Sequence, residues 1–145
     1  MIETLPFHRE HLNIIDAREY EREKVIPFLP EVFLSTAESS LDCYTLMKDG
    51  RILTCIGCYE LWEGVLDVWQ IPSIYVGENI FSYGKTVREM LNNTAEKRKA
   101  RRLQTISPAD SLHDRWHKFL GFECEGTLKE YSRFKIDHRM WARRI

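Results

Sequence analysis

One carboxylate lies in a segment where its residue type indicates chemistry. Asp67 is flanked by Leu66 and Val68 in a segment with the pattern of a strand. An unpaired carboxylate inside apolar surroundings is costly unless it has a partner or a task, such as accepting a proton from a substrate. An outward-facing, solvated Asp67 explains the same pattern. The sequence leaves both interpretations open.

Two histidines four residues apart, His113 and His117, share one face of an expected helix. The run His-Asp-Arg-Trp-His imitates the His-Glu-x-x-His zinc motif with Asp in place of Glu, but no third ligand is evident. Cys55 and Cys58 have the spacing of a zinc knuckle, yet an extended strand points them to opposite faces. We therefore expect no metal site.

A dense basic run, residues 97–102, lies at the expected end of a long helix. With Arg139, Arg143 and Arg144 it makes a candidate nucleic-acid patch. Cations are also favoured at a helix C-terminus by the helix dipole, which explains the run without any partner. The sequence does not choose between the two, and nucleic acid is not our favoured partner.

Length and composition favour one globular domain over residues 1–145. The chain has 145 residues, of which 43% are hydrophobic, so a single core is expected and intrinsic disorder is excluded. Residues 1–80 hold 6 basic and 14 acidic residues, whereas residues 81–145 hold 15 and 8. The second half should therefore attract anions. With no bilayer-length apolar run and no signal-peptide pattern, we expect a cytoplasmic protein that does not enter a membrane.

The first half of the chain should supply a meander. The hydrophobic pattern predicts a strand at residues 2–7, a helix at 8–24, and strands at 43–48, 51–61 and 65–71. Asp49 and Gly50 form a strong hairpin turn between two of these strands. Pro72 should end the last of them.

A long helix is predicted after this meander, with one apolar face formed by Phe81, Gly84, Val87, Met90, Leu91, Thr94 and Ala95. A strand at 103–106 follows it. The order of elements predicts an α+β fold: a central mixed sheet of about six to seven strands flanked by helices.

A second helix should begin with Ser107 as the N-cap, Pro108 at the first position and Asp110 in the first turn. Gly121 should end it. Strands are expected at 122–134, with Gly126 as a bulge, and at 138–144. The buried stripe of this helix is predicted to be Leu112, Trp116, Phe119 and Leu120.

Residues 103–122 read Leu-Gln-Thr-Ile-Ser-Pro-Ala-Asp-Ser-Leu-His-Asp-Arg-Trp-His-Lys-Phe-Leu-Gly-Phe. This segment resembles the C-terminal motif of the GNAT superfamily of N-acetyltransferases, in which a strand, a helix and a Gly-Phe pair precede another strand. The order of elements matches that fold over nearly the whole chain. The segment 61–69 looks more particularly like the small GNAT-like proteins of tailed bacteriophages.

The resemblance implies transfer of an acetyl group from acetyl-coenzyme A to an amine of unknown identity. In the family, the third meander strand and the strand after the long helix splay apart, and the pantetheine arm contacts exposed main chain. Here that main chain belongs to Trp69, Gln70 and Ile71. The alternative is a catalytically inactive GNAT-like phage protein that serves as a binding or virion-associated module, in the host cytoplasm or the virion.

The resemblance also places a pyrophosphate at the start of the long helix, where helix N-termini bind anions. The family pattern aligns with residues 75–81 and keeps Tyr75, Gly77 and Ile80, while Asn79 replaces a glycine. These four residues are cofactor-binding candidates. Val76 stands where the family has arginine and Phe81 where it has a small residue. An ordinary loop and helix start explains the segment equally well.

Three further positions acquire candidate roles from the resemblance. His117 stands where many family members have a tyrosine that protonates the leaving thiolate, and a plain helix-surface histidine explains the position as well. Asp67 is the first choice for the base that deprotonates the amine, ahead of Glu60 and Glu63. Asp110 falls where the family often has an asparagine that touches coenzyme A, and a helix cap explains it as well.

Overall fold

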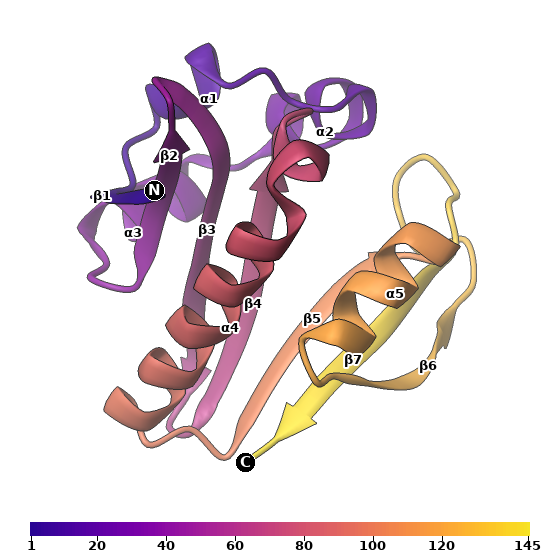
Figure 1. The fold of residues 1–145 in the computed structure, drawn as a ribbon. Coiled ribbons are helices and arrows are strands. Elements are labelled where there is room, and N and C mark those ends of the chain that lie inside the picture. The colour runs from indigo at the N-terminus through magenta and orange to yellow at the C-terminus, as the bar shows by residue number, and fades with distance from the viewer. The chain divides into compact units, whose positions relative to one another are not determined.

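The structure is a computed structural model that describes residues 1–145, and the chain forms two compact units. Unit 1 comprises residues 1–59 and 69–90, and unit 2 comprises residues 60–68 and 91–145. Seven strands form a mixed sheet in the order β1-β2-β3-β4-β5-β7-β6 (Figure 1). The predicted α+β class with a mixed sheet is confirmed.

Unit 1 begins with β1 (Glu3–Pro6), which pairs antiparallel with β2 (Cys43–Lys48). β2 in turn pairs antiparallel with β3 (Arg51–Trp62). The turn between them adopts positive φ at Asp49 (51°) and Gly50 (77°), as a two-residue hairpin requires. β4 (Val65–Pro72) ends at the proline that predicted its end.

The single helix predicted at 8–24 is wrong: the segment contains two short helices, α1 (His11–Ile14) and α2 (Glu19–Lys24). Ala17 forms an isolated β-bridge with Ser73, and the Ile74 N–H donates to the Asp16 carbonyl at 2.9 Å. These long-range bonds hold the backbone at 16–17 extended, so a continuous helix is impossible.

Two helical segments follow that the sequence did not predict. The 3₁₀-helix η1 (Ile26–Phe28) leads into α3 (Glu31–Ser39), and Pro30 occupies the N-cap position of α3. Side chains of these segments pack on a buried cluster of unit 1. The cluster contains Phe7, Leu12, Ile15, Ala17, Ala37, Cys43, Ile52, Cys55 and Ile71.

The long helix α4 (Ile80–Lys97) is confirmed, and the 3₁₀-helix η2 (Val76–Asn79) precedes it directly. Its buried face includes Tyr83, Val87, Leu91 and Ala95. Phe81, predicted to belong to this face, is 92% exposed. Tyr83 takes the buried position, which the 3.6-residue period also allows when the stripe is extended toward the helix start.

Unit 2 contains β5 (Arg102–Pro108), α5 (Ser111–Phe119), β6 (Glu123–Leu128) and β7 (His138–Arg144). β7 pairs antiparallel with both β5 and β6, and α5 runs alongside β5 and β7 (Figure 1). Gly126 lies at a register shift in β6, which confirms the bulge. The strand predicted at 122–134 is shorter than expected.

The start of α5 lies later than predicted. β5 continues to Pro108, which pairs with His138, so Ser107 belongs to a strand and Asp110 is the N-cap. The end is as predicted: Gly121 has a φ of 88°, a left-handed conformation typical of a residue that terminates a helix.

The predicted buried stripe of α5 is largely wrong. Leu112 is 50% exposed and Phe119 is 45% exposed, and Trp116 stacks on Phe119 with ring centroids 5.8 Å apart. The buried side chains are Leu120, which was predicted, and His117. The helix is rotated so that a polar ring rather than Phe119 faces inward. No helix of the chain has the length and apolar character needed to cross a membrane.

Candidate active site

The middle of β4 packs its side chains into unit 1. Trp69 makes edge-to-face contacts with Phe7 and Phe33, at centroid distances of 5.3 and 5.1 Å. Gln70 donates a hydrogen bond to the Tyr83 hydroxyl, and Ile71 is buried. Because these side chains are used in packing, any contact that Trp69, Gln70 and Ile71 make with a ligand must come mainly from the main chain.

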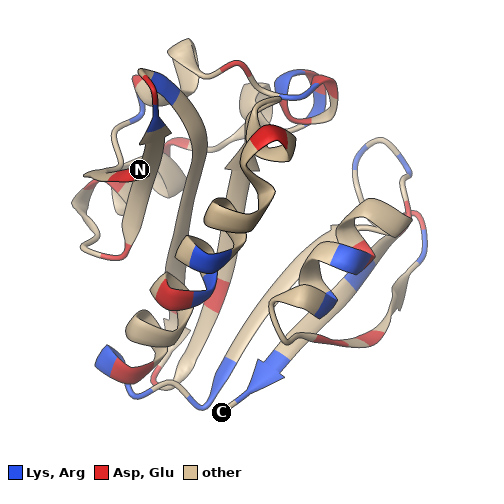
Figure 2. Cartoon of the chain, in the orientation of Figure 1, with Lys and Arg blue, Asp and Glu red and all other residues tan.

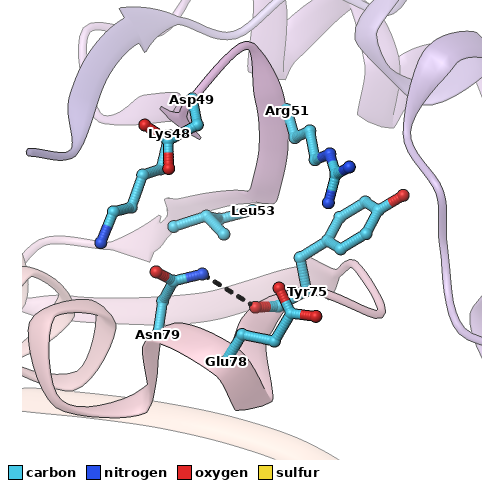
Figure 3. Close-up of a pocket in the computed structure, with 7 residues that line it drawn as sticks. All are labelled: Lys48, Asp49, Arg51, Leu53, Tyr75, Glu78 and Asn79. Carbon is cyan, nitrogen blue, oxygen red and sulfur yellow. Dashed lines mark hydrogen bonds between the residues drawn. The ribbon is translucent and has the colours of Figure 1, made fainter.

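The loop after β4 is fixed by hydrogen bonds on both sides of Tyr75. The Tyr75 hydroxyl donates to Asp16 at 2.8 Å, and its N–H donates to the Ser73 hydroxyl at 3.1 Å. The side-chain amide of Asn79 donates to the Tyr75 carbonyl at 3.1 Å (Figure 3). Tyr75 and Asn79, both predicted from the sequence, are therefore brought together at the start of α4.

This helix start carries no side-chain cap. Tyr75 is the N-cap of η2 and its side chain makes no capping hydrogen bond. Nothing lies within 4 Å of a Cβ added at Gly77, so the space beside that backbone is open. Ile80 and Phe81 are exposed, and the Phe81 ring therefore does not fill the loop. Unpaired N–H groups in a first turn, with the helix dipole behind them, suit an anion such as pyrophosphate.

Two cations beside this loop were missed by the sequence analysis. Lys48 and Arg51, at the ends of the β2–β3 hairpin, line a pocket of about 290 Å³ together with Tyr75 and Asn79 (Figure 3). The Arg51 guanidinium lies over the Tyr75 ring, 4.5 Å from its centroid. The sequence shows a cation on each side of the hairpin turn but contains no signal that places them near residue 75.

Asp67 is half-buried in the part of β4 that belongs to unit 2. Burial raises the pKa of its carboxyl, and the Gln104 amide, 3.5 Å away, partly opposes that shift. β4 and β5 pair in parallel from Val65 to Asp67, and the Thr105 hydroxyl then donates to the Val68 carbonyl at 2.8 Å. The Val68 carbonyl, next to Asp67, therefore accepts a hydrogen bond from a side chain of β5 rather than from its main chain. The opening that the resemblance implies further along these strands stays a prediction.

His117 is buried, with 7% of its surface exposed. Its Nδ1 lies 3.3 Å from the Ser107 hydroxyl, and its ring stacks on Trp141 at a centroid distance of 5.5 Å. Burial, assisted by the charge of His113, lowers the pKa of His117 to about 4. The imidazole is therefore neutral near pH 7, when it can donate one hydrogen bond but holds no proton to give away readily.

Asp110 is occupied as a helix cap. Its carboxylate accepts the His113 N–H at 2.9 Å and lies 2.8 Å from Nδ1 of the same residue. Partial burial opposes the effect, but these bonds to His113 together lower the pKa of Asp110. His113 and His117 thus contact different partners, Asp110 for the first and Ser107 with Trp141 for the second.

Several residues of the candidate nucleic-acid patch are engaged within unit 2. Arg102 forms a two-pronged ion pair with Glu125, with distances of 2.9 and 2.6 Å. Arg139 pairs with Asp114, and Arg143 donates to Asn92 and to a main-chain carbonyl. Figure 2 shows basic residues on β5 and β7. Arg102 and Arg139 therefore have carboxylate partners within unit 2 and need no nucleic acid to balance their charge.

Solved structures of acetyltransferases match the whole chain. Ard1 from Thermoplasma volcanium matches with a TM-score of 0.79 at 9% identity, covering 99% of this chain and 97% of that one. The ribosomal-protein-S18-alanine N-acetyltransferase from Escherichia coli matches with a TM-score of 0.74 at 15% identity, covering 100% and 94%. A GNAT-family acetyltransferase from Bacillus anthracis matches with a TM-score of 0.72 at 12% identity, covering 99% and 94%.

The chain therefore has the fold of GNAT acetyltransferases, as the sequence resemblance implied. No protein-family model matches the sequence, and no significant match is found among curated proteins. The similarity to phage proteins in particular gains no support from these comparisons and stays a prediction.

Proposed function

We propose that the protein is an acetyl-coenzyme A-dependent N-acetyltransferase that acts on an amine. The observation that carries the proposal is the full-length match to acetyltransferase folds at TM-scores of 0.72 to 0.79. The uncapped helix start with open space at Gly77 adds support, because the pyrophosphate of the cosubstrate needs such a place. Tyr75, Asn79 and Ile80 complete this proposed loop, and the main chain of Trp69, Gln70 and Ile71 contacts the pantetheine arm.

In the proposed reaction the amine nitrogen forms a bond to the thioester carbonyl carbon, and the carbon–sulfur bond breaks. Asp67 accepts the proton that the ammonium loses before attack, and the second proton leaves the nitrogen for solvent once the new bond has formed. Burial raises the pKa of Asp67 and so makes it a better base than an exposed carboxylate. The neutral His117 ring donates a hydrogen bond toward the leaving sulfur, and solvent completes the protonation. Asp110 serves as the cap of α5 and acts on the cosubstrate only through that helix.

Titration calorimetry with acetyl-coenzyme A tests the binding step, and we expect a complex with one cosubstrate per chain. Transfer is measured by mass spectrometry with a panel of amines: peptides with free N-termini, lysine peptides and small amines. Asp67→Asn should lower turnover by about 10²- to 10⁴-fold, the range for a general base, while leaving the affinity for acetyl-coenzyme A unchanged. Absence of binding at millimolar acetyl-coenzyme A would refute the proposal.

A catalytically inactive binding module is the second candidate, and His117 is the observation that favours it. A ring with a pKa of about 4 is a poor proton donor at neutral pH. In this case acetyl-coenzyme A binds but no amine is acetylated. A virion-associated role belongs to this candidate. Turnover that disappears in both Asp67→Asn and His117→Phe would exclude it.

A further inference from the structure

We infer that the pocket between the β2–β3 hairpin and the start of α4 binds the phosphorylated ribose of a nucleotide. This inference rests on the proposed function only in part, since a free nucleotide would fit the same chemistry. The pocket has a volume of about 290 Å³ and lies entirely within unit 1. Two cations and two carboxylates line it: Lys48, Arg51, Asp49 and Glu78.

Both cations lack an ionic partner. Neither Lys48 nor Arg51 forms an ion pair, although Asp49 and Glu78 line the same pocket. The Arg51 side chain extends toward the ring of Tyr75, whereas the Lys48 side chain extends to the other side of the pocket, on the side of Asn79 (Figure 3). An ammonium and a guanidinium that line one pocket without a carboxylate partner can each donate N–H hydrogen bonds to an incoming anion.

Contacts with Tyr75 hold the Arg51 guanidinium in an orientation that suits phosphate binding. Its guanidinium lies over the Tyr75 ring, and the Tyr75 hydroxyl is fixed by its 2.8 Å bond to Asp16. Stacking uses the face of the guanidinium and leaves the N–H groups on its edge directed sideways, the geometry that binds phosphate through two hydrogen bonds. The uncapped start of η2 lies beside it and adds the positive end of a helix dipole.

The two carboxylates decide between a bare phosphate and a nucleotide. An isolated phosphate group would be repelled by Asp49 and Glu78, which the two cations would have to offset. A phosphorylated ribose suits this mixed lining better, because a free sugar hydroxyl donates to a carboxylate while the phosphate accepts from the cations. The mixed charge of the lining therefore favours a phosphate that is joined to a sugar with a free hydroxyl.

Calorimetry with adenosine 3′,5′-bisphosphate, adenosine and inorganic pyrophosphate tests the inference. We expect the bisphosphate to bind more tightly than either of the others. Lys48→Gln and Arg51→Gln should each weaken it by roughly tenfold or more, the loss expected for a charge-assisted hydrogen bond. Lys85→Gln, an exposed change on α4 outside the pocket, is the matched control and should leave the affinity unchanged. Thermal unfolding verifies that all three variants fold.

Glu78→Gln separates the role of the carboxylates from that of the cations. The substitution should strengthen pyrophosphate binding, because it removes a negative charge that repels the phosphates. It should also reduce the ratio of the affinity for the bisphosphate to that for pyrophosphate, because the carboxylate that accepts the ribose hydroxyl is lost. The inference is overturned if the bisphosphate does not bind at millimolar concentration, or if Lys85→Gln weakens it as much as the pocket variants. It is also overturned if Glu78→Gln leaves the preference unchanged.

Coenzyme A and 3′-dephospho-coenzyme A identify the source of the nucleotide. If coenzyme A displaces the bisphosphate and its dephospho form does so more weakly, the pocket holds the nucleotide end of the cosubstrate. Simultaneous binding assigns the pocket to a separate nucleotide. Bisphosphate binding without acetyl transfer refutes the proposed function and keeps the inference. A protein that transfers acetyl groups with a KM unaffected by Arg51→Gln, and that does not bind the bisphosphate, would keep the proposed function and refute the inference.

Discussion

The starts of α4 and α5 solve the same problem in opposite ways. Both leave main-chain N–H groups without intrahelical partners. At α5 the Asp110 carboxylate accepts the His113 N–H, so the helix supplies its own anion. At α4 no side chain caps the preceding η2, and the cations Lys48 and Arg51 lie beside it instead. A helix start that is closed by its own carboxylate is a structural element, whereas an open one beside cations is prepared for a ligand.

A carboxylate placed at the open start of α4 should make it resemble the closed start of α5. Of the changes considered, it should have the largest effect on the affinity for acetyl-coenzyme A. Gly77→Glu should weaken acetyl-coenzyme A by about 10- to 100-fold, because it adds a negative charge where the pyrophosphate is proposed to bind. Gly77→Ala is the matched control. Gly77 has no positive φ and open space around it, so alanine should fold normally and bind like the wild type. Equal affinities of the two variants in calorimetry would contradict the comparison.

Acid should lower the stability of the protein through His117, which lies near the C-terminal end of α5. Burial lowers the pKa of His117 to about 4, below its usual 6.5, so the unfolded chain binds its proton first as the pH falls. The unfolding free energy should therefore decrease between pH 6.5 and 4, by at most about 3 kcal/mol.

Urea unfolding at several pH values measures this loss, and His117→Phe should remove the part of the pH dependence that His117 contributes in that window, while His11, whose pKa is also lowered, keeps its own contribution. The ring resonance of His117 should titrate with a midpoint near pH 4 in an NMR experiment. A midpoint near 6.5 would mean that the ring is solvated, in conflict with its stacking on Trp141.

Loss of the cap at the closed start should affect stability and not binding. Asp110→Ala should lower the unfolding free energy by about 1 kcal/mol, the usual cost of an N-cap. Asp110→Asn keeps an acceptor and should stay near the wild type. Neither variant should change the affinity for acetyl-coenzyme A by more than about twofold, since the carboxylate is already engaged. A large loss of affinity in both variants would instead assign Asp110 to the cosubstrate.

The smallest effect should be the titration of Asp110 itself. Its pKa lies below the usual 3.8, so its stabilising contribution is present above that value and is lost as the pH falls through the lowered pKa. Comparing Asp110 with Asp110→Asn in a His117→Phe background isolates this contribution from that of the imidazole. If the two proteins show the same unfolding free energy from pH 5 down to pH 2, the cap is not ionic.

Elements set by adjacent residues could be predicted from the sequence. The Asp49–Gly50 turn, the strands at 43–48 and 138–144, and the end of α5 at Gly121 all agree with the structure. Each depends on backbone preferences within a few residues. The helix predicted at 8–24 failed because Ala17 pairs with Ser73, which lies far away in the chain.

The face of α5 shows the same limit at the level of side chains. Apolar periodicity predicted that Phe119 and Leu112 are buried. In the structure His117 is the buried residue, because its ring stacks on Trp141 of β7. Which stripe of an amphipathic helix is buried depends on what the sheet presents to it, and a single sequence does not contain that contact.

The amino-acid sequence by itself determined the class of fold, the order of most elements and the end of α5 at Gly121, because hydrophobic period and turn chemistry are local properties. The tertiary structure alone decided that the start of α5 is closed and that the start of α4 is open beside Lys48 and Arg51. Capping requires that a particular carboxylate reach a particular N–H, and the cations come from a hairpin more than twenty residues earlier in the chain. Such distances in space depend on how the strands pair, and local preferences do not encode them.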